Sequence, residues 1–158
     1  MVSQEKIDKI DIKIIRALQK DARANFANIA KDCGMSTDTI VKRFRKMKKR
    51  GIIRGTTVLL NPKSFGNDCI ASLGIDVDYP HVEEVVKSIR KIRNIVFSTR
   101  SMGKHDIFAI AVLTDVGRLG QLKDTIKGHP MVRAVTVSIW VDQTLLCPEN
   151  FEFGHLKK

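Results

Sequence analysis

The stretch Ser36–Arg50, STDTIVKRFRKMKKR, decides how the N-terminal part of the chain folds. Ile40, Phe44 and Met47 stand at i, i+4 and i+7, so they share one face of a helix. Seven of the last nine residues of the stretch are Lys or Arg. Gly51 follows at once and suits the left-handed residue that often succeeds a helix end. The stretch therefore predicts a helix with one apolar face for packing and a cationic remainder.

The cations of this helix have two possible explanations. A lysine-rich helix can simply be a solvated surface that keeps a protein in solution. After Asp38, however, the stretch has no acidic residue, so its cations repel one another with little local relief. We therefore expect the helix to bind a polyanion, and its charge and context favour double-stranded DNA.

Two apolar repeats precede the cationic helix. Residues at helical spacing predict a first helix from about Asp8 to Asp21; they are Ile7, Ile10, Ile14 and Leu18. A shorter second helix carries Phe26, Ile29, Ala30 and Cys33 on one face, and Gly34 follows it. The order of helix, short helix, tight turn and cationic helix is that of a helix-turn-helix, whose last helix enters the major groove of DNA.

The start of such a helix meets base edges, while its cations neutralise phosphates. The base-reading candidates are Thr37, Asp38, Thr39, Lys42 and Arg43. Arg43 has the planar fork that fits guanine, whereas Asp38 is explained better by favourable charge in the first helical turn. The expected phosphate contacts are Lys46, Lys49 and Arg50. Ser36 belongs to the same predicted DNA-binding surface and is also the expected N-cap.

The net charge of +11 is divided unevenly along the 158 residues. Residues 1–62 carry 15 Lys/Arg against 6 Asp/Glu, a balance of +9, and residues 63–158 carry 13 against 11, a balance of +2. A basic module is therefore joined to a nearly neutral one, and we expect the two modules to have different partners.

Sites for metals, cofactors and catalysis are not expected. Cys33, Cys69 and Cys147 are far apart and form no CxxC pair, which argues against a disulfide framework or a zinc ribbon. The four histidines lack the paired spacing of a metal site; they are His81, His105, His129 and His155. The sequence has no catalytic triad, nucleotide-binding loop, apolar leader or membrane-length apolar window. We expect a cytoplasmic protein that is not an enzyme and has no membrane partner.

The neutral module shows the pattern β-α-β-β-α-β, which predicts a ferredoxin-like fold. Its first strand alternates apolar Cys69, Ala71, Leu73, Ile75 and Val77, and its last alternates Val135, Val137, Ile139 and Val141. The expected fold class is α+β: a helix-turn-helix domain over residues 1–52, a linker strand over 53–66, the ferredoxin-like domain over 67–145 and a tail over 146–158. Both helices cover one sheet face, so we expect a second copy to cover the other face in a homodimer.

In this order the modules resemble the Lrp/AsnC family of transcription regulators, and the local motifs match as well. The opening motif of the family is matched by Asp8, Asp11, Ile14, Leu18, Asp21 and Arg23, and its continuation by Ile29, Ala30, Ser36, Arg43, Gly51, Ile53 and Gly55. The sequence GKHD at Gly103–Asp106 resembles the GxxD turn of the family's effector domain. His105 replaces the usual aromatic residue of that turn, and Met47 replaces a leucine.

The resemblance implies a sequence-specific DNA-binding transcription regulator. It also implies an effector such as an amino acid, which binds between neighbouring ferredoxin-like domains and alters the assembly of dimers into larger oligomers such as an octamer. The implied pocket is lined by Met102, Gly103, Lys104, His105, Asp106, Thr136 and Ser138. Asp106 would pair with an ammonium group; alternatively, Gly103 only forms a turn that Asp106 caps.

Two other functions remain open. One is an architectural protein that wraps DNA without sequence preference. The other is an enzyme similar to siroheme decarboxylases, which share the build of the family but have a degenerate DNA-binding half. The dense cationic face of the helix argues against the enzyme.

Overall fold

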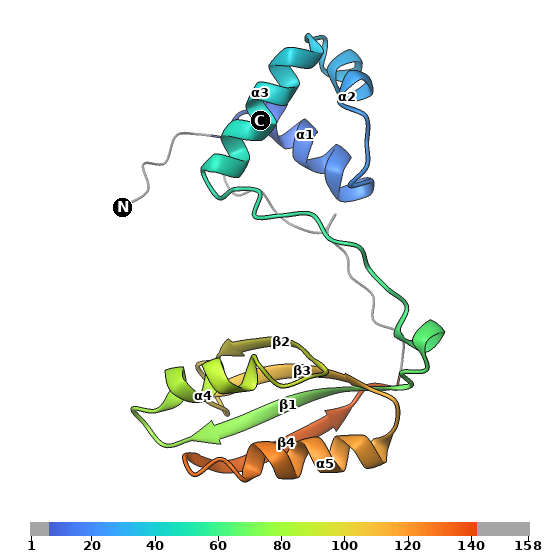
Figure 1. Cartoon of the computed structure of the whole chain (residues 1–158). Helices are drawn as coiled ribbons and strands as arrows, with labels where there is room; N and C mark the ends of the chain where they lie inside the picture. The colour runs from blue at the N-terminus through green and yellow to red at the C-terminus, as the bar shows by residue number, and fades with distance from the viewer. Residues whose placement is uncertain (1–6, 142–158) are drawn as a thin grey trace. The chain divides into compact units, whose positions relative to one another are not determined.

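The computed structural model describes residues 7–141. These residues divide into two compact units, with the boundary between Leu59 and Leu60 (Figure 1). The boundary falls inside the predicted linker, and the predicted tail over residues 146–158 lies outside the described residues. Each unit is described by itself below.

Three helices form the N-terminal unit, as the apolar repeats predicted: α1 (Lys9–Lys20), α2 (Phe26–Cys33) and α3 (Thr37–Lys49). Side chains of Asp8, Asn25 and Ser36 cap the three N-termini by accepting backbone N–H groups. Gly34 ends α2 with a φ of 65°, and Gly51 follows α3 with a φ of 70°. These left-handed angles favour glycine, which has no Cβ to clash with the backbone.

The core of the N-terminal unit differs in one respect from the sequence-based expectation. Ile40 and Met47 of α3 are 0% and 1% exposed, and they pack with buried residues of α1 and α2. Phe44, expected to share the packed face with Ile40 and Met47, is only half-buried, and its ring packs at a tilt against Phe26 with 5.1 Å between centroids. The reason is helical geometry: at about 100° per residue, Phe44 lies about 40° to one side of Ile40, whereas Met47 returns almost to the same line.

The predicted linker strand is wrong for the described chain. The segment after α3 forms no strand, and its only regular element is a short 3₁₀ helix, η1 (Pro62–Phe65). Val58, Leu59 and Leu60 are each more than 60% exposed. An extended segment becomes a strand only when a neighbour satisfies its backbone hydrogen bonds, and the described part of this one chain offers none.

The C-terminal unit has the predicted ferredoxin-like order. Its elements are β1 (Cys69–Val77), α4 (Val82–Ile89), β2 (Ile95–Arg100), β3 (Ile107–Leu113), α5 (Val116–Lys127) and β4 (Val132–Ile139). The strands form one antiparallel sheet in the order β2-β3-β1-β4, so the apolar strand β3 lies inside the sheet.

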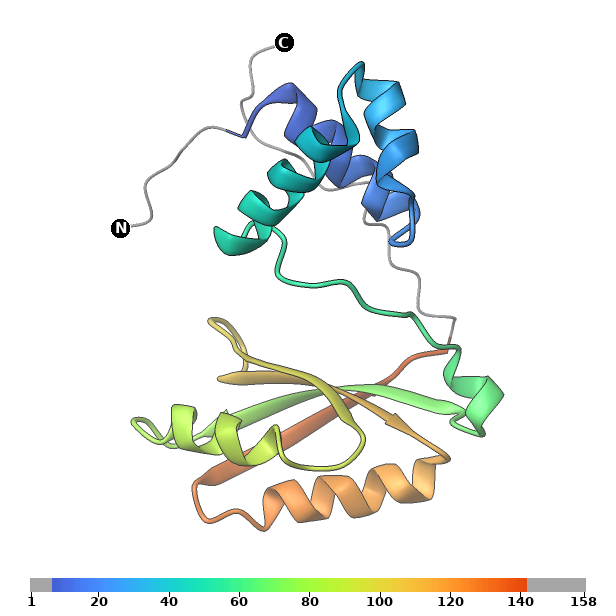
Figure 2. The same cartoon turned by 45° about the horizontal axis from the view of Figure 1, so that its top comes forward.

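One face of the sheet carries the core of this unit. The alternating residues of β1, from Cys69 to Val77, pack with the buried sides of α4 and α5, and both helices lie on this face (Figure 2). At the end of β4 the predicted alternation fails. Ile139 is 48% exposed and Val141, beyond the strand, is 98% exposed; in the described part of the chain the pairing of β4 with β1 ends at Ile139 and Ala71.

Within residues 7–141, no helix combines the length and the apolar character that crossing a membrane requires.

We predict that Met47→Ala destabilises the N-terminal unit by about 2–5 kcal/mol, because it leaves a cavity among fully buried side chains. Phe44→Ala, which removes a half-buried ring, should cost less. Denaturant unfolding followed by helical circular dichroism measures both. A larger loss for Phe44→Ala than for Met47→Ala would contradict the observed position of the core.

Candidate functional site

The outward face of α3 carries a stripe of charged residues. We take the direction of the buried residue Ile40 as 0° around the helix axis. Four residues then lie between about 140° and 200°, directly opposite the core: Asp38, Lys42, Arg45 and Lys49. All four are exposed. Three cations and one first-turn carboxylate therefore face away from the domain along the whole length of the helix.

Arg45 was not among the residues predicted to contact DNA, although its spacing from Lys42 and Asp38 (i+3 and i+7) could have identified it. Among the predicted residues, Thr37, Lys42, Lys46 and Lys49 are exposed, and Arg50 is partly exposed. Ser36 and Thr39 are hydrogen-bonded to each other, with 2.8 Å between their hydroxyls, and Ser36 Oγ also accepts the backbone N–H of Thr39 at 3.2 Å. Ser36 therefore acts as the predicted N-cap.

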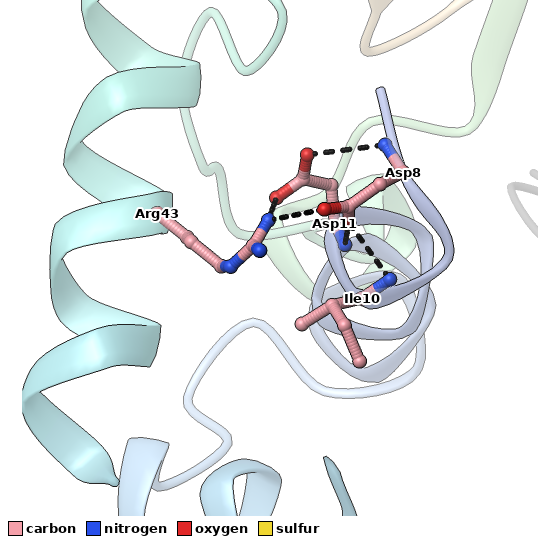
Figure 3. A network of polar contacts seen from close by, with 4 residues as sticks. All are labelled: Asp8, Ile10, Asp11 and Arg43. Carbon is pink, nitrogen blue, oxygen red and sulfur yellow. Dashed lines mark hydrogen bonds and ion pairs between the residues drawn. The ribbon is translucent and has the colours of Figure 1, made fainter. Parts of the chain in front are cut away.

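Arg43 is occupied by contacts inside the N-terminal unit (Figure 3). Its Nη1 donates to Asp8 Oδ2 at 2.7 Å and to Asp11 Oδ1 at 2.9 Å. The other oxygen of each carboxylate caps the start of α1: Asp8 Oδ1 accepts the backbone N–H groups of Ile10 and Asp11, and Asp11 Oδ2 accepts that of Asp8. Each aspartate therefore closes α1 with one oxygen and holds α3 with the other.

The charges of this network stabilise one another. Burial opposes the ionisation of Asp8, but hydrogen bonds from the Asp11 N–H and the Arg43 guanidinium outweigh it, so the pKa of Asp8 lies below its usual value. Hydrogen bonds to Asp11 and Asp8 raise the pKa of Arg43. The Arg43 side chain is only 29% exposed. This geometry argues against the expected guanine contact and gives Arg43 the role of fixing α3 to α1.

In the C-terminal unit, a groove of about 750 Å³ runs between α4 and the β2–β3 hairpin. Of the seven predicted effector residues, Met102 and Asp106 line it. Asp106 Oδ2 accepts the backbone N–H of Val77 at 2.8 Å and lies 3.4 Å from Arg133 Nη2. The Asp106 carboxylate thus ties the base of the hairpin to β1 and is already engaged. Among the described residues, no hydrogen bond joins it to the Gly103 turn that the alternative interpretation had it cap.

The other predicted effector residues do not line the groove. His105 lies over Gly74 of β1, so close that a Cβ at Gly74 would collide with its ring, and its Nδ1 lies 2.8 Å from Asp76 Oδ1. Thr136 pairs with the same Gly74 across the sheet, and Ser138 pairs with Ser72. These positions alternate with the buried residues of β1, so they belong to the face that the helices leave uncovered. The exposed Gly103 and Lys104 lie in the hairpin turn between these two surfaces. Within one chain, the seven predicted effector residues are therefore divided among the groove, the uncovered sheet face and the hairpin turn.

We predict that Arg43→Ala and Asp11→Asn each destabilise the N-terminal unit by about 1–3 kcal/mol, because the first leaves two carboxylates without their cation and the second removes one of the two carboxylates that offset Arg43. The double variant should be less unstable than the sum of the two, since both changes remove the same interaction. Chemical denaturation of the four proteins of this cycle measures the coupling. Strict additivity would contradict the proposed role of Arg43.

Comparison with known proteins agrees with this architecture. Residues 7–48 match the AsnC-type helix-turn-helix domain. The transcriptional regulator Ptr1 of Methanocaldococcus jannaschii is 34% identical over 115 residues, which are 73% of this chain and 78% of the relative. The structure of Escherichia coli AsnC has a TM-score of 0.81 at 25% identity, and the superposition covers 90% of this chain and 97% of the AsnC chain. A Neisseria meningitidis transcriptional regulator, solved in complex with L-Met, has a TM-score of 0.81 at 23% identity over 89% of this chain and 94% of its own. With its helix-turn-helix unit and ferredoxin-like unit in this order, the chain belongs to the Lrp/AsnC family of transcription regulators.

Proposed function

We propose that this member of the family is a sequence-specific DNA-binding regulator whose DNA affinity responds to a small effector of the amino-acid type. The observation that carries the DNA-binding part is the outward stripe of α3. Its cations lie opposite fully buried Ile40 and Met47, so the side of the helix that is free for a partner is the positively charged one. Action on DNA also agrees with the expected cytoplasmic location.

Lys42 and Arg45 are the proposed base-reading residues, because they lie on the outward line and within the first three turns of α3. Thr37 adds an exposed hydroxyl near the helix start. Lys49, at the far end of the helix, is the proposed phosphate contact, together with the predicted Lys46 and Arg50. Arg43 contributes indirectly, by fixing the helix that carries these groups.

Two other functions have less support. An architectural DNA-binding protein would use the same cations but would bind all sequences with similar affinity. An enzyme similar to siroheme decarboxylases would have no use for a cationic stripe on α3, and the relatives described above are named as transcription regulators.

The uncovered sheet face supports the proposal of a homodimer that assembles further, for example to an octamer. Phe97 and Phe108 are 48% and 36% exposed on this face, with their rings 6.4 Å apart in an edge-on arrangement. Exposed aromatic area is a common feature of protein interfaces. A second copy of the same face would cover the two rings without requiring any other partner.

The effector part of the proposal is supported by the groove beside α4, which is large enough for an amino acid. The Neisseria meningitidis regulator in complex with L-Met is a protein of the same fold.

We predict that Lys42→Ala or Arg45→Ala reduces discrimination between the preferred DNA site and random DNA. Lys49→Ala should weaken binding to the preferred site and to random DNA by the same factor. It should also reduce the dependence of affinity on salt, because the log–log slope falls by about 0.9 per lost phosphate contact. Selection of bound sites from random DNA, followed by titrations at several salt concentrations, tests this. Equal affinity of the unmodified protein for selected and random sites would favour the architectural alternative.

We predict that an effector changes DNA affinity and that DNA changes effector affinity by the same factor, as linkage requires. Calorimetric titration with a panel of amino acids, with and without the selected DNA, measures both factors. The effector part of the proposal fails if no member of the panel changes DNA affinity.

A further inference from the structure

The near neutrality of the C-terminal unit conceals a separation of charge. Between Glu84 and Asp106 the chain has six Lys/Arg and no carboxylate, whereas the rest of residues 60–141 has five Lys/Arg and eight Asp/Glu. The fold brings parts of the carboxylate-free stretch together at the groove, because α4 and β2 form its two sides.

Two arginines of this stretch line the groove from opposite sides, Arg90 at the end of α4 and Arg100 in β2. Arg90 follows Glu83, Val86 and Lys87 on the stripe of α4 that lines the groove, and its Nη2 lies 3.5 Å from the carbonyl oxygen of Ser98 in β2. Arg100, two residues after Ser98, pairs with fully buried Ile107 and so lies on the helix-covered side of β2. Both guanidinium groups therefore belong to the same groove.

The carboxylates of the groove already have cationic neighbours. Glu83 lies 3.5 Å from Lys87, and Asp106 lies 3.4 Å from Arg133. Among the described residues, neither Arg90 nor Arg100 forms an ion pair with a carboxylate. The groove thus carries two guanidinium groups that form no ion pair with a carboxylate of residues 7–141.

From this arrangement we infer that the groove binds a small aliphatic ligand with two carboxylate groups, such as a plain dicarboxylate or an acidic amino acid, through Arg90 and Arg100. A guanidinium binds a carboxylate with two parallel hydrogen bonds, so two arginines suit a ligand with two carboxylates. Val82, Val86 and Met102 line the same groove and provide apolar contacts for a short hydrocarbon chain. The inference rests on the proposed effector response and names the ligand class; it replaces the expected pairing of an ammonium group with Asp106.

The test uses the full chain and ligands that differ by one charge, titrated calorimetrically at constant ionic strength: L-glutamate, L-glutamine and glutarate. L-glutamate and glutarate should bind at least about tenfold more tightly than L-glutamine, which lacks one carboxylate. Arg90→Gln and Arg100→Gln should each weaken glutarate binding by about tenfold or more. The matched control is Arg93→Gln, which makes the same charge change in the same stretch but outside the groove, and it should change affinity by less than about threefold.

Each contrary outcome has a distinct meaning. Equal affinity for L-glutamate and L-glutamine, or an equal loss in Arg93→Gln and Arg100→Gln, would overturn the assigned ligand class or groove. If a neutral amino acid alone changes DNA affinity and no ligand with two carboxylates binds, the effector response stands and the dicarboxylate site is wrong. If ligands with two carboxylates bind with the predicted arginine dependence but leave DNA affinity unchanged, the site stands and the proposed effector response fails.

Discussion

The arrangement of the N-terminal unit depends on one guanidinium group shared by two carboxylates. Arg43 of α3 joins Asp8 and Asp11, which are also the residues that cap α1. The orientation of α3 is therefore coupled to the start of the first helix. The partial burial of the three side chains reduces screening by solvent, which makes the contacts more specific in geometry than an ion pair at an open surface.

Contacts on both sides of the buried residues of α3 determine which face of the helix points outward. Ile40 and Met47 occupy the core, Phe44 on one flank stacks on Phe26, and Arg43 on the other flank is held by α1. A rotation that brought another row of side chains outward would lose contacts on at least one flank. The charged stripe therefore points outward because the opposite side is fixed, and the cations themselves need no partner within the domain.

The C-terminal unit separates two surfaces by the alternation of its strands. Residues of the hairpin and α4 form a groove on the helix-covered side, whereas His105 and the exposed aromatic rings belong to the uncovered face. A ligand in the groove and a second copy on the uncovered face would not compete for the same side chains. Communication between them would pass through the hairpin, because Asp106 ties its base to β1 through the N–H of Val77.

The sequence by itself determined the elements and their order, because apolar periodicity and capping residues act over a few neighbouring positions. Ser36, Gly34 and the alternating β1 residues were therefore identified correctly. Tertiary structure alone decided which charges are free. Arg43 and Arg45 are two residues apart in the same cationic run, yet of these two only Arg43 contacts carboxylates of the described chain, and these lie more than 30 positions earlier in the sequence. Such pairings depend on how helices pack, which no local pattern encodes. For the same reason the linker predicted as a strand has no strand neighbour within residues 7–141.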